Sequence, residues 1–281
     1  MQITNYCSQL NELLQSTRKS GGLIHFVPTM GALHEGHVSL VKAAQAENAI
    51  VVVSVFVNPA QFNNPTDLVN YPKTLNHDKV LLEDSGCDIM FVPTEHEIYP
   101  KGALAVFDLA GLDQTMEGMY RPGHFQGVVQ VVHRFLEIMA PDAAFFGQKD
   151  FQQLTIVRHS MKSLGHSCII EGCSTVREVS GLAMSSRNML LSDLGRDNAK
   201  FIYQSLVIIK KAFANGESVS ESMEKCKDSF AKIEGVELEY LEVVDPITLR
   251  PIEGDKNKHA VACVAAFVEG VRLIDNISLF A

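Results

Sequence analysis

The run His34-Glu35-Gly36-His37 places two side chains that can act in catalysis close together. It follows an apolar segment, residues 23–27, that is typical of a buried strand, and a stretch with helical spacing of apolar residues comes next. Two imidazoles and the exposed N–H groups of a helix start can together hold a triphosphate. A zinc site is a weaker interpretation, because the metalloprotease pattern places its histidines four residues apart. A capped helix with solvent-facing histidines fits the run equally well.

Polar residues also follow two other candidate strands. Asn58 and Gln61 come after an almost unbroken apolar run, and Lys149 and Asp150 come after a later one. Because open parallel sheets bind ligands beyond the carboxyl ends of their strands, both places suit a small-molecule site. Amides suit hydroxyl and carboxylate groups, while the lysine suits phosphate oxygens and the aspartate suits Mg²⁺. The structural alternatives are a turn at Asn58 and a surface ion pair at Lys149 and Asp150.

Two further segments carry basic side chains beside glycine. Residues 177–188 form a predicted loop with two arginines and several serine hydroxyls, which can bind phosphate in a bidentate manner. A polar interdomain linker is the alternative for this segment. Residues 121–127, Arg-Pro-Gly-His-Phe-Gln-Gly, precede an apolar helix, and they indicate either an anion-binding loop or a turn.

The pattern of apolar residues predicts how these segments are positioned. Apolar runs alternate with amphipathic stretches in the first half, which indicates β-α-β units around a parallel sheet. The predicted strands are residues 22–27, 50–57, 88–92 and 143–146, with 50–57 central, and the predicted helices begin near His37 and span 75–84, 126–139 and 151–164. Further along, helices are predicted at 198–214 and 219–233, and strands at 236–244, 260–268 and 271–279. We expect an α/β domain of residues 1–176 and a smaller C-terminal α+β domain of residues 177–281.

The composition is that of an ordinary globular protein. Of 281 residues, 46% are apolar and 20% are charged, and a formal net charge of -9 removes the electrostatic reason to bind nucleic acid. The N-terminus lacks a signal-peptide pattern and no apolar run is long enough to cross a bilayer, so we expect a cytoplasmic protein without a membrane partner. Six cysteines without a Cys-x-x-Cys pair favour thiols in a reducing compartment.

Several blocks of the sequence together resemble the pantothenate synthetase (pantoate–β-alanine ligase) family. They occur in family order over nearly the whole chain, at residues 26–37, 54–62, 121–125, 146–153, 181–188 and 240–246. The resemblance implies a Rossmann-like parallel-sheet domain of the nucleotidylyltransferase type, with a C-terminal domain that closes over the nucleotide. It also implies a homodimer.

The activity that the resemblance implies is an ATP-dependent ligation in pantothenate and coenzyme A biosynthesis. The carboxylate of pantoate attacks the α-phosphate of ATP to give pantoyl adenylate and pyrophosphate, and β-alanine then displaces AMP to give pantothenate. Mg²⁺ would neutralise the triphosphate, with Asp150 and Asp78 as its candidate ligands. Catalysis would rest on positioning and electrostatic stabilisation, without a covalent enzyme intermediate.

Three sets of site residues are carried over by matched position. The residues that stabilise charge on the phosphates would be His37, described in the family as the proton donor, and His34, Lys149 and Arg187. The residues that bind pantoate or β-alanine would be Gln61, Gln153 and Asn58. The residues that line the nucleotide would be Met30, Gly31, Ala32, Leu33, His34, Glu35, Gly36, His37, Gly147, Gln148, Lys149, Asp150, Val176, Met184, Ser185, Ser186 and Arg187.

Some positions depart from the commonest family pattern. Ser180 stands where an aspartate is usual, Gln148 where a glutamate is frequent, and Asn76-His77 in a stretch that is often more acidic. These departures bear on Mg²⁺ coordination and loop polarity, and the reaction class is unaffected. The alternatives are a nucleotidylyltransferase with the same histidine signature, a fragment of an aminoacyl-tRNA synthetase, and an inactive nucleotide-binding module. Short length and acidic charge disfavour the second, and the intact site residues disfavour the third.

Overall fold

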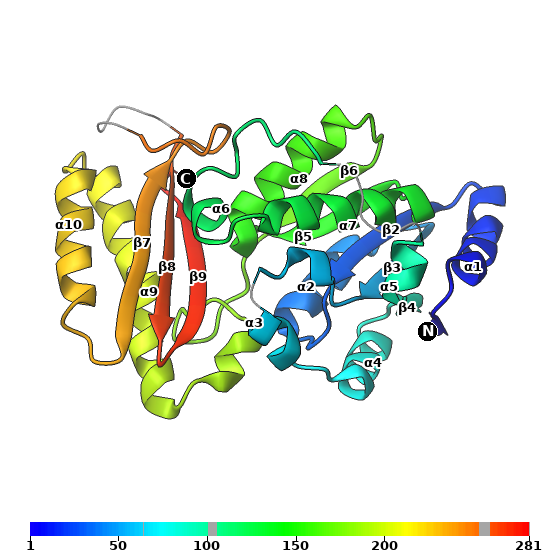
Figure 1. Cartoon of the computed structure of the whole chain (residues 1–281), viewed down its shortest axis with the longest axis horizontal. Helices are drawn as coiled ribbons and strands as arrows, with labels where there is room; N and C mark the ends of the chain where they lie inside the picture. Colours follow the sequence, from blue (N-terminus) through cyan, green and yellow to red (C-terminus); the bar gives the residue numbers. More distant parts are fainter. Residues whose placement is uncertain (64, 101–105, 253–258, 281) are drawn as a thin grey trace. The chain divides into compact units, whose positions relative to one another are not determined.

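Residues 1–63, 65–100, 106–252 and 259–280 are described in the computed structural model of the chain (Figure 1). The fold divides into two units, one of Met1–Gln148 with Gln153–Ser174 and the other of Lys149–Gln152 with Thr175–Ala281. The segment Lys149–Gln152 therefore groups with the second unit although the chain on both sides of it belongs to the first. Within the described residues, no helix has both the length and the apolar character needed to cross a membrane.

The first unit is built on a six-stranded sheet in the order β1-β4-β3-β2-β5-β6, in which all neighbouring strands are parallel. Its strands are β1 (Gln2–Thr4), β2 (Leu23–Thr29), β3 (Ala49–Val55), β4 (Ile89–Phe91), β5 (Ala143–Gly147) and β6 (Ile169–Cys173). The predicted parallel-sheet α/β fold is confirmed. The sequence did not predict β1, which has three residues, or β6, which has no long apolar run.

Helices cover both faces of this sheet. The helices of this part of the chain are α1 (Cys7–Lys19), α2 (Glu35–Ala44), α3 (Pro65–Asn70), α4 (Leu75–Asp84), α5 (Glu95–Ile98), α6 (Met116–Tyr120), α7 (His124–Met139) and α8 (Phe151–Ser163), with short 3-10 turns η1 (Pro59–Gln61) and η2 (Gln148–Asp150). Successive residues of β2 point to opposite faces. Phe26 contacts Phe135 of α7 with ring centroids 5.3 Å apart, while Val27 packs in a cluster with Val41 of α2 and Leu82 of α4. Figure 1 shows α7 running alongside the strands of the sheet.

The strand β3 lies inside the sheet between β4 and β2, as the apolar run 50–57 predicted. Val51 and Val53 belong to the cluster on the α2 side, and Val52, which points the other way, is also fully buried. Burial on both faces explains why nearly every residue of the run is apolar. The carboxyl ends of β2 and β3, where the predicted site residues follow, lie side by side because the two strands pair in register from Leu23 with Ala49 to Thr29 with Val55.

The second unit has an antiparallel sheet of three strands with helices on one face, so the predicted α+β character of the C-terminal part is confirmed. Its elements are η3 (Ser186–Leu190), α9 (Asp193–Ala214), α10 (Val219–Phe230), β7 (Val236–Val244), β8 (Val261–Val268) and β9 (Val271–Ser278). Leu206 of α9 and Phe230 of α10 share a buried core with Leu241 of β7 and Val264 of β8. Figure 1 shows both helices along one side of this sheet. The helix α9 begins five residues before the predicted start, where the Ser192 side chain accepts a hydrogen bond from Gly195 N–H at 3.0 Å.

Candidate active site

The two histidines form the start of α2. His34 is the capping residue, and its Nδ1 accepts a hydrogen bond from Gly36 N–H at 3.1 Å, while His37 Nδ1 accepts one from His34 N–H at 3.3 Å. The ring centroids are 4.2 Å apart. Because Nδ1 of each ring accepts a hydrogen bond, a neutral ring carries its own proton on Nε2, which is the nitrogen that can donate to a phosphate oxygen. The structure confirms that the histidines cap the helix, and phosphate binding at its positively polarised end stays a prediction.

Asp78 of α4 holds the loop that leads into these histidines. Its side chain is 1% exposed, and its two carboxylate oxygens accept hydrogen bonds from Ala32 N–H at 3.1 Å and Leu33 N–H at 2.9 Å. Thr74 donates a third hydrogen bond at 3.0 Å. The loop needs this support because Gly31 and Ala32 both have positive φ, at 83° and 49°, a conformation that is strained for alanine. The structure thus gives Asp78 a positioning role, and its role as a magnesium ligand stays a prediction.

Asn58 and Gln61 lie beyond the carboxyl end of β3, at and next to η1. The Asn58 side chain is buried among protein groups: it donates to Gly127 O at 3.0 Å and to Gln61 Oε1 at 3.3 Å, and it accepts from the Tyr99 hydroxyl at 3.0 Å. Gln61 Nε2 donates to the sulfur of Met30 at 2.9 Å, which brings together predicted site residues from the ends of β2 and β3. These contacts show Asn58 as a support for Gln61, while the substrate-binding roles of both remain predictions.

The segment at residues 121–127 supports the same turn from the other side. His124 Nδ1 lies 2.8 Å from Gln61 O, and a Cβ at Gly127 would lie 2.1 Å from Ala60 O, so only glycine allows α7 to approach η1 this closely. Arg121 pairs with Glu117 at 3.6 Å, one turn earlier. Of the two interpretations of this segment, the structure favours the structural one for His124 and Gly127.

Gly147 belongs to β5, the next strand of the sheet, and Gln153 belongs to α8, the helix that follows this strand. β5 pairs with β2 in parallel, so its carboxyl end lies beside that of β2, and Gly147 is its last residue. Gln153 lies in the first turn of α8 and is half-buried. Within the first unit, the sheet edge therefore collects Met30, the histidine pair, Gln61 and Gln153 at the ends of three adjacent strands.

The remaining predicted nucleotide-binding residues belong to the second unit, with the exception of Gln148. Gln148 belongs to the first unit, where its side-chain amide donates to Gly172 O at 3.4 Å. Lys149 and Asp150 are in η2. Val176 and Met184 face each other across a short hairpin, because Met184 N–H donates to Val176 O at 3.0 Å. Ser185 caps η3, since its hydroxyl accepts from Arg187 N–H at 3.3 Å. Ser186 and Arg187 are the first two residues of η3 and are half-buried.

Three residues that support the site were not singled out from the sequence, and a fourth, His124, lies in the segment 121–127 that was. Tyr99 fixes Asn58, and burial raises the pKa of its hydroxyl group, which keeps it a hydrogen-bond donor. His124 fixes the backbone of Gln61. Asp275 and Asn276 of β9 contact the segments around Arg177 and Lys149. The only signal for Asp275 in the sequence is a charged residue in a strand at an inward-facing position, between Leu273 and Ile277.

The chain is similar along its whole length to one family of enzymes. The family model for pantoate-beta-alanine ligase matches residues 2–278. A protein of Phocaeicola vulgatus named pantothenate synthetase is 47% identical over 279 residues, which cover 99% of this chain and 99% of that protein. A protein of the same name from Bacteroides thetaiotaomicron is 44% identical over 278 residues, which cover 99% and 98%.

Solved structures show the same relationship. The crystal structure of pantothenate synthetase from Thermus thermophilus has 39% sequence identity and a TM-score of 0.93, and the match covers 100% of both chains. The pantoate-beta-alanine ligase of Francisella tularensis, crystallised with beta-gamma ATP and β-alanine, has 35% identity and a TM-score of 0.82, and the match covers 99% of this chain and 98% of that one. The chain therefore belongs to the pantoate–β-alanine ligase family.

Proposed function

We propose that this protein condenses pantoate with β-alanine to form pantothenate, through a pantoyl adenylate intermediate, with release of AMP and pyrophosphate. The family match over residues 2–278 supports the ligation. The ATP compound and β-alanine named for the Francisella tularensis complex support ATP and β-alanine as substrates. The single structural observation that carries the adenylation step is the pair of mutually capping histidines at the start of α2, beyond the carboxyl end of β2.

In the first step, a carboxylate oxygen of pantoate attacks the α-phosphorus of ATP. A new O–P bond forms, the bond to the β-phosphate bridging oxygen breaks, and pyrophosphate leaves with the electron pair. Negative charge builds up on the phosphate oxygens in the transition state, so donors fixed in advance are the most effective stabilisers. We assign this role to Nε2–H of His34 and His37, whose rings are already oriented by backbone N–H groups. Lys149 and Arg187 would supply positive charge to the same phosphates.

In the second step, the amine of β-alanine attacks the carbonyl carbon of pantoyl adenylate. The C–N bond forms, the C–O bond to AMP breaks, and the amine loses a proton. Gln61 and Gln153 would orient the hydroxy acid, and this assignment is supported by their places beyond β3 and β5 at one sheet edge. Amide side chains suit this task because they bind hydroxyl and carboxylate groups without adding charge near the reacting centre.

Mg²⁺ would be bound mainly by the triphosphate. The described residues contain no group of three or more His, Cys, Asp or Glu side chains placed to hold a metal ion, which fits an ion that arrives with the nucleotide. Asp150 would contact it directly or through water, since it lies beside Lys149 in η2. When bound, the ion neutralises phosphate charge and favours departure of pyrophosphate.

Isotope exchange tests the adenylation step. With Mg²⁺ present, we expect exchange of labelled pyrophosphate into ATP only when pantoate is added, and AMP release that additionally requires β-alanine. A nucleotidylyltransferase would not need both acids. If folded protein shows neither reaction, the proposed function is wrong.

The assembly and the compartment are also proposals. We propose a homodimer on the family resemblance alone, and light scattering in solution would show twice the chain mass of 30.9 kDa. A cytoplasmic location is supported by the six cysteines, which are all thiols in the structure, as is typical of a reducing compartment.

A further inference from the structure

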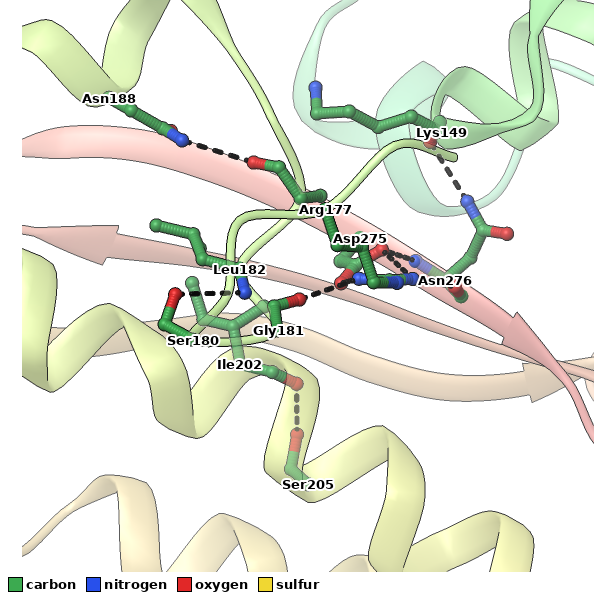
Figure 2. A network of polar contacts seen from close by, with 11 residues as sticks. Lys149, Arg177, Ser180, Gly181, Leu182, Asn188, Ile202, Ser205, Asp275 and Asn276 are labelled. Carbon is green, nitrogen blue, oxygen red and sulfur yellow. Dashed lines mark hydrogen bonds and ion pairs between the residues drawn. The ribbon is translucent and has the colours of Figure 1, made fainter. Parts of the chain in front are cut away.

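Arg177 ties a loop of the second unit to the strand β9. Its guanidinium donates to both carboxylate oxygens of Asp275, at 2.5 and 3.0 Å, to Gly181 O at 3.1 Å and to Asn276 O at 3.3 Å. The same group stacks on the ring of Tyr203 in α9, 3.9 Å from its centroid. Figure 2 shows Arg177 beside Asp275, with Gly181 at one end of the contact and Asn276 at the other. A guanidinium with this many partners has one orientation.

The loop that Arg177 holds is the one that precedes the predicted phosphate-binding residues. Glu178 N–H donates to Leu182 O at 2.8 Å, and Met184 N–H donates to Val176 O at 3.0 Å, which makes a narrow hairpin. The arm that returns from this hairpin continues into Ser185, Ser186 and Arg187. The contact between Arg177 and the Gly181 carbonyl, at the tip of the hairpin, therefore fixes the start of this arm.

The next residue of β9 holds a second segment. Asn276 Nδ2 donates to the backbone carbonyl of Lys149 at 2.9 Å, and Figure 2 shows the Lys149 side chain running away from this contact. Successive side chains of a strand point to opposite faces, so Asp275 and Asn276 reach two different segments from adjacent positions. Both segments, Lys149–Gln152 and the loop after Thr175, belong to the second unit.

Asp275 is a charged residue that is almost completely buried. The residue is 3% exposed and occupies a core-facing position of β9. Burial raises the pKa of its carboxyl group, while the Arg177 guanidinium and the Asn276 N–H act in the opposite direction. A buried ion pair is a costly way to stabilise a fold, and its best-attested use is to fix one arrangement of the groups around it.

We propose that Asp275 and Asn276 are positioning residues for nucleotide binding: Asp275 sets the loop 176–187 through Arg177, and Asn276 sets the backbone at Lys149. Neither residue contacts ATP in this proposal. The inference rests on the proposed function in that it takes Lys149 and Arg187 as phosphate-binding residues. Its specific content is that loss of either contact weakens ATP binding and leaves pantoate binding unchanged.

The test compares two near-isosteric variants with one control. Asn276→Leu removes the donor to Lys149, and Asp275→Asn removes the charge that faces Arg177. Glu239→Gln is the matched control, because it breaks the half-buried ion pair between Arg272 and Glu239 in the same sheet. Titration calorimetry with ATP gives the dissociation constant, exchange kinetics give separate KM values for ATP and pantoate, and thermal melting shows that each variant folds.

We expect Asn276→Leu to raise the dissociation constant and KM for ATP by about three- to tenfold, the value of one hydrogen bond. Asp275→Asn should raise them by about tenfold or more, because a charged partner is lost. The KM for pantoate should stay within about twofold of the wild-type value in both variants. In Glu239→Gln, the dissociation constant and the KM for ATP should also stay within about twofold. In Asp275→Asn alone, hydrogen exchange at Gly181 and Met184 should also become faster.

Two outcomes overturn the inference: unchanged ATP affinity in folded Asn276→Leu, or an equal rise in KM for ATP and pantoate. If Asp275→Asn fails to fold, Asn276→Leu alone decides, because it removes no buried charge. A wild-type protein that binds ATP but shows no pantoate-dependent exchange would disprove the proposed function, and the ATP dissociation constants of the variants would still decide on the positioning role.

Discussion

The two units fix their candidate nucleotide-binding residues by different physical means. In the first unit, His34 and His37 cap one helix and each other, and the buried Asp78 accepts two backbone N–H groups of the preceding loop. In the second unit, the loop is held by a charged pair, Arg177 and Asp275, whose members are 98 residues apart. In the first unit, backbone N–H groups stabilise the single charge of Asp78. In the second unit, the charges of Arg177 and Asp275 stabilise each other.

This difference indicates which mutations should have the largest effect in each unit. When the charge of a carboxylate held by N–H groups is removed, those neutral groups lose part of their support but no unpaired charge is left behind. An ion pair behaves differently, since the loss of one member leaves the other charged and desolvated. We therefore expect mutations in the second unit to reduce stability most, and mutations at the histidine pair to reduce turnover most.

The largest effect is expected from Arg177→Met. It leaves the Asp275 carboxylate without its partner, and we expect a loss of about 3–5 kcal/mol in the free energy of unfolding. The double variant Arg177→Met with Asp275→Leu should recover most of this loss, because the uncompensated charge is gone. Urea denaturation of the three proteins measures both values. A double variant no more stable than the single one would show that the charge is not the cause.

The next effect is that of His37→Ala on adenylation. We expect the rate of pyrophosphate exchange to fall by about 10²–10³-fold, the typical cost of losing one donor to a developing anion. The melting temperature should fall by only a few degrees, since one capping contact of His34 N–H is lost. His159→Ala, at an exposed position of α8, is the control and should keep full activity. Exchange within tenfold of wild type would remove His37 from the catalytic set.

A smaller effect is expected from Asp78→Asn, which keeps the shape but can accept at only one of its two terminal atoms. We expect a loss of about 1–3 kcal/mol in stability and about tenfold in exchange rate, because the loop at Ala32 and Leu33 is held less firmly. The Mg²⁺ concentration for half-maximal rate should not change. A strong rise in that concentration would instead identify Asp78 as a metal ligand. Asp84→Asn, exposed on the same helix, is the control.

The smallest expected effect is the pH dependence of the stability of Arg177→Met, which separates the behaviour of Asp275 from that of Asp78. Burial raises the folded-state pKa of Asp275, and without Arg177 it rises further. A group with a raised folded pKa favours the folded state at low pH, and this contribution is lost as pH rises through that pKa. The stability deficit of Arg177→Met should therefore be larger at pH 8 than at pH 5, by about 1.4 kcal/mol per pH unit of added shift. The double variant with Asp275→Leu should show no such trend.

Several elements lie where the pattern of apolar residues in the sequence predicted them. The bounds of α4 and β7 agree with the predicted ranges 75–84 and 236–244, and β3 was recognised by an apolar run that needs two covered faces. The strand β6 was missed because it is an edge strand with an exposed Ile169 and a glycine in its five residues. A three-residue strand such as β1 carries too few side chains for any period to show.

The candidate site was predictable where it depends on neighbours in sequence. A helix start near His37 was expected and α2 begins at Glu35, where the reciprocal capping by His34 and His37 involves residues only two and three apart. The anchors were not expected, because Asp78 meets Leu33 across 45 residues and Asp275 meets Arg177 across 98. No spacing rule in a single sequence connects residues at such distances; the fold brings them together.

The mutual capping of His34 and His37 has an entropic consequence for nucleotide binding. Ordering a mobile side chain on binding costs about 0.5–1.5 kcal/mol, and two freely rotating imidazoles would both incur that cost when a phosphate arrives. Here the two rings lose their rotational freedom when the helix α2 forms, because backbone N–H groups already fix their planes. The orientation of the phosphate donors is thus part of folding, and the nucleotide meets a helix end that is already arranged.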